Sequence, residues 1–214
     1  DVERSRGLGD VYKRQLQYKE VNEALLRTST SGGFQLLGLS DFPGQGSAFV
    51  GILDAFWESK GLVTPEKFRE SCAPTVLLAR LPKRTFRNGE KLKAKMEIYH
   101  FGKDALNSRK LNWTLTGEDG TVYHKGSLKT KSIQPATVDS LGIIELPLNG
   151  MDSARKLTLK AELGGIHNEW DVWVYPEQPK TEQHNFVYTR TWNDETKQWL
   201  NEGKNVLLIP EKCK

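Results

Sequence analysis

The interpretation of this chain depends on residues 32–80, GGFQLLGLSDFPGQGSAFVGILDAFWESKGLVTPEKFRESCAPTVLLAR. The stretch opens with the apolar run FQLLGL, residues 34–39, which follows two glycines and precedes an Asp-Phe-Pro-Gly turn. A short apolar run between turn signals is typical of a buried strand. We therefore expect a strand at 34–39 that leads into a long loop.

The loop combines glycines with large aromatic side chains, namely Gly44, Gly46 and Gly51 with Phe42, Phe49, Phe56 and Trp57. Loops that carry so many rings usually cover or line a site. Aromatic faces stack on sugar CH groups while neighbouring polar groups bind the hydroxyls. We predict a carbohydrate substrate as partner, with Asp41 and Gln45 as polar contacts and Trp57 as a stacking platform.

Two of these candidates also have a purely structural interpretation. Asp41 stands first in a turn sequence, where Asp is favoured for conformational reasons. Trp57 could pack beneath its own loop. The spacing Gly44-x-Gly46 lacks the dinucleotide fingerprint and the Lys of a P-loop, so a phosphate cradle is excluded. After the loop, Thr64-Pro65-Glu66 predicts the N-cap and first turn of a helix.

The loop block, LLRTSTSGGF before it and WDVWVYP at 170–176 together resemble glycoside hydrolase family two, the β-galactosidase-like enzymes. Over residues 16–214 the resemblance implies the last αβ unit of a (β/α)8 barrel at 16–81, followed by an immunoglobulin-like β-sandwich. It implies an enzyme whose parent chain cleaves O-glycosidic bonds with retention, using two close carboxylates. In that family both catalytic glutamates lie on earlier barrel strands. The resemblance thus implies no catalytic residue here and a missing upstream barrel as partner.

The helix of the implied αβ unit is expected at residues 18–28, where Tyr18, Val21, Leu25 and Leu26 recur at helical spacing. The C-terminal end of the strand at 34–39 would then point into the active-site mouth of the barrel.

From Pro82 the apolar pattern changes to period two. Leu92, Ala94, Met96 and Ile98 alternate with lysines and a glutamate, and Leu111, Trp113 and Leu115 repeat the pattern. A hairpin turn is expected at 117–120, and further strands at 127–133, 142–146, 157–163 and 169–175. We predict an antiparallel immunoglobulin-like β-sandwich at 82–177. Trp113 is interpreted as core.

The sequence HNEWDVW, residues 167–173, gathers polar and aromatic side chains. Strand alternation places one of Trp170 and Trp173 outside the core. That ring would bind sugar or pack on a neighbouring domain. The alternative to an enzyme fragment is therefore a non-catalytic carbohydrate-binding or domain-scaffolding β-sandwich module.

Residues 178–214 begin with a polar, Pro-containing linker. A strand at 185–189, a helix capped by Asn193 or Asp194 and ended by Gly203, and the apolar run 206–209 predict a β-α-β unit. The apolar run is typical of a strand buried on both faces, so we expect the truncated start of a further α/β domain.

The 214 residues carry a formal net charge of +4 and lysines that alternate with glutamates, which argues against a nucleic-acid partner. Two cysteines without C-x-x-C spacing and four histidines predict no metal site, and no cofactor is expected. No apolar run approaches the roughly 18 residues of a membrane span. The residues leave the compartment open; the resemblance alone implies a periplasmic or secreted bacterial protein.

Residues 10–15, DVYKRQ, correspond to the translation of a transposon adapter used in sequencing libraries. We expect residues 1–15 to be an assembly artefact, with a natural basic arm as the alternative, and exclude them from fold reasoning.

Overall fold

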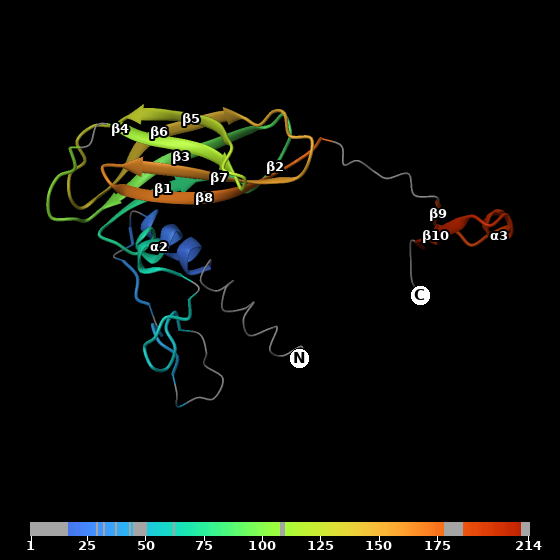
Figure 1. The fold of residues 1–214 in the computed structure, drawn as a ribbon, viewed down its shortest axis with the longest axis horizontal. Coiled ribbons are helices and arrows are strands. Elements are labelled where there is room, and N and C mark those ends of the chain that lie inside the picture. The colour runs from blue at the N-terminus through green and yellow to red at the C-terminus, as the bar shows by residue number, and fades with distance from the viewer. Residues whose placement is uncertain are drawn as a thin grey trace. The chain divides into compact units, whose positions relative to one another are not determined.

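The computed structural model describes residues 17–28, 30–31, 33–36, 38–42, 44, 51–61, 63–107, 110–177 and 186–210. The chain divides into two compact units, Asp1–Glu177 and Gln178–Lys214. The first unit contains a helix over residues 17–26, called here the N-terminal helix, then α2 (Pro65–Arg69) and eight strands (Figure 1). The second contains two strands and one helix.

The eight strands of the first unit form two sheets. The three-stranded sheet has the order β1-β3-β6, and the five-stranded sheet has the order β2-β8-β7-β4-β5. Neighbours are antiparallel except β2 and β8, which are parallel. The strands are β1 (Thr75–Arg80), β2 (Thr85–Arg87), β3 (Lys91–His100), β4 (Lys110–Gly117), β5 (Val122–Lys129), β6 (Thr137–Pro147), β7 (Arg155–Leu163) and β8 (Ile166–Tyr175).

The two sheets share one hydrophobic core, which we call the sandwich core. In β3 the predicted alternation is present: Leu92, Ala94 and Met96 are buried, while the lysines between them are exposed. The predicted hairpin turn also forms, because Gly117 donates its N–H to the Thr121 carbonyl at 2.9 Å. Period-two patterning therefore locates the central strands of both sheets correctly.

Strand β1 is buried at four consecutive positions. Leu77 and Ala79 face the sandwich core, whereas Val76 and Leu78 pack against Leu26 of the N-terminal helix. The N-terminal helix thus covers the outer face of β1, and Figure 1 shows it and α2 beneath β1 and β8. An unbroken apolar run here reflects burial on both faces rather than membership of a parallel sheet.

The predicted fold class is wrong, because the described residues contain no (β/α)8 barrel and consist mainly of antiparallel sheet. The strand expected at 34–39 does not form at its described residues, 34–36 and 38–39. Ser40 makes only an isolated bridge with Leu53, and Phe34 packs beside Leu26. A buried parallel strand needs neighbours on both sides, and the described chain supplies none. The hydrolase, family-two and barrel-fragment descriptions lose their structural basis with it.

The second unit consists of β9 (Phe186–Thr189), α3 (Asp194–Asn201) and β10 (Asn205–Leu208), with β9 and β10 parallel. Asn193 caps α3, accepting the N–H of Thr196 at 2.9 Å, as the sequence predicts. The expected burial of the last strand is wrong, since Leu207, Leu208 and Ile209 are all exposed. A single strand-helix-strand unit is too small to cover both faces of its own sheet.

Gly126 provides a test of packing in the five-stranded sheet. It lies directly opposite Trp113, and a Cβ at this position would overlap the indole. We expect Gly126→Ala to lower the free energy of unfolding by about 1–3 kcal/mol through overpacking. The exposed neighbour Ser127→Ala should change it by less than about 0.5 kcal/mol. Urea unfolding of both variants checks this, and equal effects would contradict the packing of the indole over Gly126.

Candidate functional site

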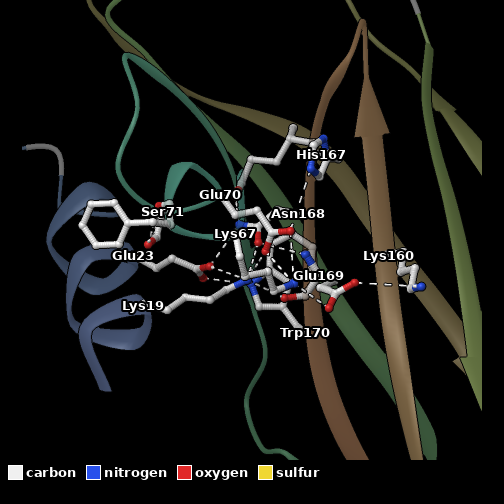
Figure 2. Close-up of polar contacts among 12 residues, drawn as sticks. Lys19, Glu23, Lys67, Glu70, Ser71, Lys160, His167, Asn168, Glu169 and Trp170 are labelled. Carbon is white, nitrogen blue, oxygen red and sulfur yellow. Dashed lines mark hydrogen bonds and ion pairs between the residues drawn. The ribbon is translucent and has the colours of Figure 1, made fainter. Parts of the chain in front are cut away.

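The most elaborate polar arrangement lies at the seam, which we define as the junction of β1 with the first half of β8, residues 166–172. β1 is an edge strand, and β2 pairs with β8 only at Trp173, Val174 and Tyr175, so the first half of β8 is an edge as well. Asn168 joins the two edges by donating its amide to the Leu77 carbonyl at 2.7 Å. The N-terminal helix lies over this seam (Figure 2).

Glu23 of the N-terminal helix lies at the centre of the seam with its side chain fully buried. Its carboxylate accepts hydrogen bonds from Trp170 Nε1 at 2.8 Å and from Asn168 Nδ2 at 3.0 Å. Lys19 and Arg27, one helical turn to either side, lie 3.7 and 3.5 Å away. Burial raises the pKa of Glu23, and the nearby Lys19 charge and the two hydrogen bonds only partly oppose it.

Lys19 ties the N-terminal helix to both β8 and the segment after α2. Its ammonium donates to Asn168 Oδ1 at 2.5 Å, to the Glu169 carbonyl at 2.8 Å and to Glu70 at 3.0 Å. These three contacts use all three hydrogens of the ammonium. We call Lys19, Glu23, Asn168 and Trp170 the seam cluster.

A second group of charges continues from the seam cluster toward α2. Thr64 caps this helix as predicted, accepting the Lys67 N–H at 3.2 Å. Lys67 then contacts Glu169 at 2.5 Å and Glu70 at 2.9 Å. Burial alone would lower the pKa of Lys67, but hydrogen bonds to Glu169 and Glu70 outweigh it and raise that pKa. Burial would likewise raise the pKa of Glu169, yet the contact with Lys67 lowers it overall.

Arginine side chains bind further carbonyls of the two edges. Arg27 donates to the Ala79 carbonyl at 2.8 Å, and Arg84 donates to the Asp171 carbonyl at 3.1 Å. Arg80 in turn donates to the carbonyl of Arg27 at 2.6 Å. Edge strands whose backbone groups are covered in this way do not accept a further strand.

A cavity of about 280 Å³ lies beside the charges, on the outer face of β4, β7 and β8. Its lining includes Asn112, Thr114, Lys160, Glu162, His167 and Glu169, with Glu70 at one side. His167 Nε2 lies 3.9 Å from Glu70. Among the described residues no group of His, Cys, Asp and Glu is arranged to hold a metal ion. Glu70 pairs with Lys19 and Lys67, and Glu169 pairs with Lys67.

The three predicted substrate contacts lie elsewhere. Asp41 is buried and accepts hydrogen bonds from Lys60 Nζ at 2.7 Å and the Gly51 N–H at 2.8 Å, which closes the base of the loop. Trp57 is 67% exposed at the loop tip, so packing beneath its own loop is wrong. Gln45 lies outside the described residues. No finding tests sugar contact by any of the three.

The tryptophans of the sandwich follow strand alternation. Trp170 is buried and Trp173 is 40% exposed, which confirms that one of the two faces outward. Trp113 packs against the sandwich core. The sequence interpretation missed that the inner face of β8 also carries Asn168. It also missed the signal in the N-terminal helix, where Lys19 and Glu23 are spaced i and i+4 on the same face as Leu26.

Comparison with known proteins gives little beyond the sandwich itself. A family described as "Domain of unknown function (DUF8488)" matches residues 90–176, less than half of the chain. A search of curated proteins finds no match. None of the helices in the described ranges is long and apolar enough to cross a membrane.

Solved structures share part of the fold at low similarity. Spo0M, a sporulation control protein from Bacillus subtilis, is 17% identical with a TM-score of 0.37 over 50% of this chain and 51% of that one. Alpha-2-macroglobulin from Escherichia coli is 17% identical, with a TM-score of 0.39 over 52% of this chain and 8% of that one. A cycloisomaltooligosaccharide glucanotransferase from Paenibacillus is 7% identical, with a TM-score of 0.38 over 55% of this chain and 16% of that one.

The chain thus spans about half the length of the Spo0M structure that it matches. Likenesses this weak carry no functional argument. They give no support to the resemblance to glycoside hydrolase family two, which stays untested.

The buried Glu23 predicts a pH dependence of stability. Because its folded-state pKa lies above the ordinary value of 4.5, the folded state favours the protonated carboxyl. This contribution is complete below pH 4.5 and is lost as the pH rises through the raised pKa. We therefore expect Glu23→Gln to gain stability relative to the parent chain as the pH rises through that window.

Urea unfolding between about pH 4 and pH 8 measures this difference. Glu20→Gln is the matched control, because Glu20 lies on the same helix with an exposed side chain. A difference between Glu23→Gln and the parent chain that does not change with pH would rule out a raised pKa for Glu23.

Asn168 donates hydrogen bonds both to Glu23 of the N-terminal helix and to the Leu77 carbonyl of β1. Asn168→Ala removes one hydrogen-bond partner each from Glu23, Lys19 and the Leu77 carbonyl, in a part of the structure closed to water. We expect a loss of about 2–4 kcal/mol in the free energy of unfolding. Asn112→Ala, on the outer face of the same sheet, should cost less than about 0.5 kcal/mol. Thermal or urea unfolding of both variants measures these losses. Similar losses in Asn168→Ala and Asn112→Ala would contradict the role of Asn168 in joining the helix and β1.

Proposed function

We propose that this chain is a non-catalytic scaffolding module. In it the β-sandwich holds the N-terminal helix and α2 in one fixed orientation. The observation that carries the proposal is the burial of Glu23 in the seam, hydrogen-bonded to two residues of β8. Through such a contact the sandwich supports a neighbouring segment, and no catalysed reaction is involved.

Polar contacts fix orientation more sharply than apolar ones. An apolar helix face can slide or rotate with little loss of interaction free energy. A buried carboxylate, in contrast, loses its hydrogen-bond partners when the helix rotates. In some proteins a buried polar group specifies one arrangement at a cost in stability. The partners of Glu23, Trp170 Nε1 and Asn168 Nδ2, come from neighbouring inward positions of one strand, so they define both the rotation and the position of the helix.

The fixed orientation determines which side of the N-terminal helix faces outward. Val21 is 54% exposed and Leu25 is 37% exposed, although both belong to the apolar pattern of the sequence. The helix therefore presents Val21 and Leu25 away from the sandwich, while Glu23 and Leu26 face it. A scaffold that displays a preset surface to another body would have this arrangement.

The decisive experiment measures hydrogen exchange in the full chain and in Lys19→Met and Glu23→Leu variants. We expect both variants to lose protection of amides 17–26 while amides of β3 and β7 stay protected, because the sandwich core does not depend on the seam cluster. Ala24→Gln, at an exposed position of the same helix, should retain the parent pattern. Loss of protection throughout the first unit would contradict the proposal, since the helix would then be part of one cooperative fold.

A carbohydrate-binding module is the competing function, favoured by the exposed Trp57 and Trp173. Isothermal titration of the full chain with galactosides, mannosides and glucuronides tests it. Binding that disappears in Trp57→Ala or Trp173→Ala would replace the scaffolding proposal. We expect no heat of binding from any of these sugars.

A further inference from the structure

Lys19 and Asn168 hold an amine nitrogen and a carboxamide carbon within reach of each other. The Lys19 nitrogen donates to Asn168 Oδ1 at 2.5 Å, and Figure 2 shows both side chains in one group of contacts between the N-terminal helix and β8. The Asn168 Cγ atom lies at most about 3.7 Å from that nitrogen, because a C=O bond is about 1.2 Å long. Reacting atoms about 3–3.5 Å apart are poised for attack. An amine in this position can displace the amide nitrogen and form a new amide.

Glu23 is placed to move the protons that this exchange requires. Its Oε1 atom accepts the hydrogen bond of Asn168 Nδ2 at 3.0 Å and lies 3.7 Å from the Lys19 nitrogen. Its Oε2 atom accepts from Trp170 Nε1 at 2.8 Å, which keeps Oε1 beside the two reacting nitrogens. Burial raises the pKa of Glu23, so this carboxyl group holds a proton more readily than an exposed one. One carboxyl oxygen can therefore serve both the attacking and the departing nitrogen.

A backbone donor contacts the oxygen on which negative charge develops during such an attack. The Glu169 N–H donates to Asn168 Oδ1 at 2.8 Å. Donors fixed in this way stabilise the tetrahedral intermediate of acyl transfer. Water is largely excluded, since the Glu23 side chain is fully buried, Asn168 is 2% exposed and the Lys19 side chain is 17% exposed. A nucleophile, an electrophile, an acid-base group and an oxyanion donor therefore meet at the seam.

We propose that Lys19 and Asn168 join in an intramolecular isopeptide bond, with Glu23 as the acid-base group. Glu23 takes a proton from the Lys19 ammonium, and the neutral amine attacks Asn168 Cγ while the carbonyl electron pair moves to Oδ1. Glu23 gives its proton to Nδ2, the Cγ–Nδ2 bond breaks and ammonia departs. Glu23 then takes a second proton from the former lysine nitrogen. The ammonium and the carboxamide thus become one secondary amide, one ammonia and one proton on Glu23, and no further reactant is consumed.

The bond deepens the scaffolding function and rests on it, because it makes permanent the helix orientation that the seam cluster sets. It forms once in each chain and turns over no substrate. The two proposals can fail separately. The mass of the chain reports whether the bond has formed. Lys19→Arg keeps a cation at the seam but removes the amine, so hydrogen exchange of amides 17–26 in this variant tests the scaffolding function without the bond.

Intact-mass spectrometry of the denatured full chain, after incubation of the folded protein near neutral pH, tests the bond. We expect the mass to be lower than that of the sequence by one ammonia. Lys19→Arg and Glu23→Gln should each show their full sequence mass, because the first lacks the amine and the second lacks the acid-base group. Lys67→Arg is the matched control, since Lys67 contacts the carboxylates of Glu169 and Glu70 in the same network, and it should still lose one ammonia. Urea unfolding establishes that each variant is folded before its mass is measured.

Peptide mapping separates this bond from other losses of ammonia. Asn88-Gly89 and Asn149-Gly150 can each cyclise to a succinimide with the same change of mass. Trypsin does not cleave after an acylated lysine, so the bond predicts a branched peptide in which residues 15–27 are joined to residues 161–180. A full sequence mass in the parent chain overturns the proposal. A loss of ammonia without the branched peptide, or one that persists in Lys19→Arg, overturns it as well.

Discussion

The first unit depends on how two edge strands are covered where they meet. β1 and the first half of β8 each leave backbone carbonyls without a neighbouring strand, and such edges are prone to pairing with other chains. Here side chains occupy those carbonyls: Lys19 at Glu169, Arg27 at Ala79 and Asn168 at Leu77. Glu23 balances the positive charges that gather in the process. The N-terminal helix therefore covers carbonyls of both edges.

On the opposite side of the sandwich the two edge strands are covered in a different way. There β5 and β6 are the edge strands of their sheets, and their own side chains make the contact. His124 donates a ring N–H to the Pro147 carbonyl at 3.0 Å, and Leu128 packs against Gly142. Glycine at 142 leaves room for the leucine and allows a positive φ. On that side, side chains of the strands themselves make the contact, whereas at the seam the N-terminal helix adds Lys19 and Arg27 to the contact made by Asn168.

Much of the local structure could be predicted from the sequence, because it depends on nearby residues. The alternation of Leu92, Ala94 and Met96, the cap at Thr64 and the cap at Asn193 all follow from short-range patterns. The predicted barrel strand is wrong, because the run at 34–39 has the composition of a buried strand but no partner strand in the described chain. Pairing is a long-range property, and composition alone does not supply it.

The seam cluster was not predicted for a related reason. Helical periodicity grouped Val21 and Leu25 with Leu26, yet only Leu26 of these three is buried, beside Asn22 and Glu23, while Val21 and Leu25 are exposed. An apolar stripe turns toward the fold when the surface that receives it is itself apolar. The face of β8 toward the helix presents Asn168 and the indole N–H of Trp170, so it favours carboxylate and ammonium groups instead. Once that polar match fixes the helix, Val21 and Leu25 face away from the sandwich. An exposed apolar face is then a consequence of orientation by hydrogen bonds rather than of a weak core.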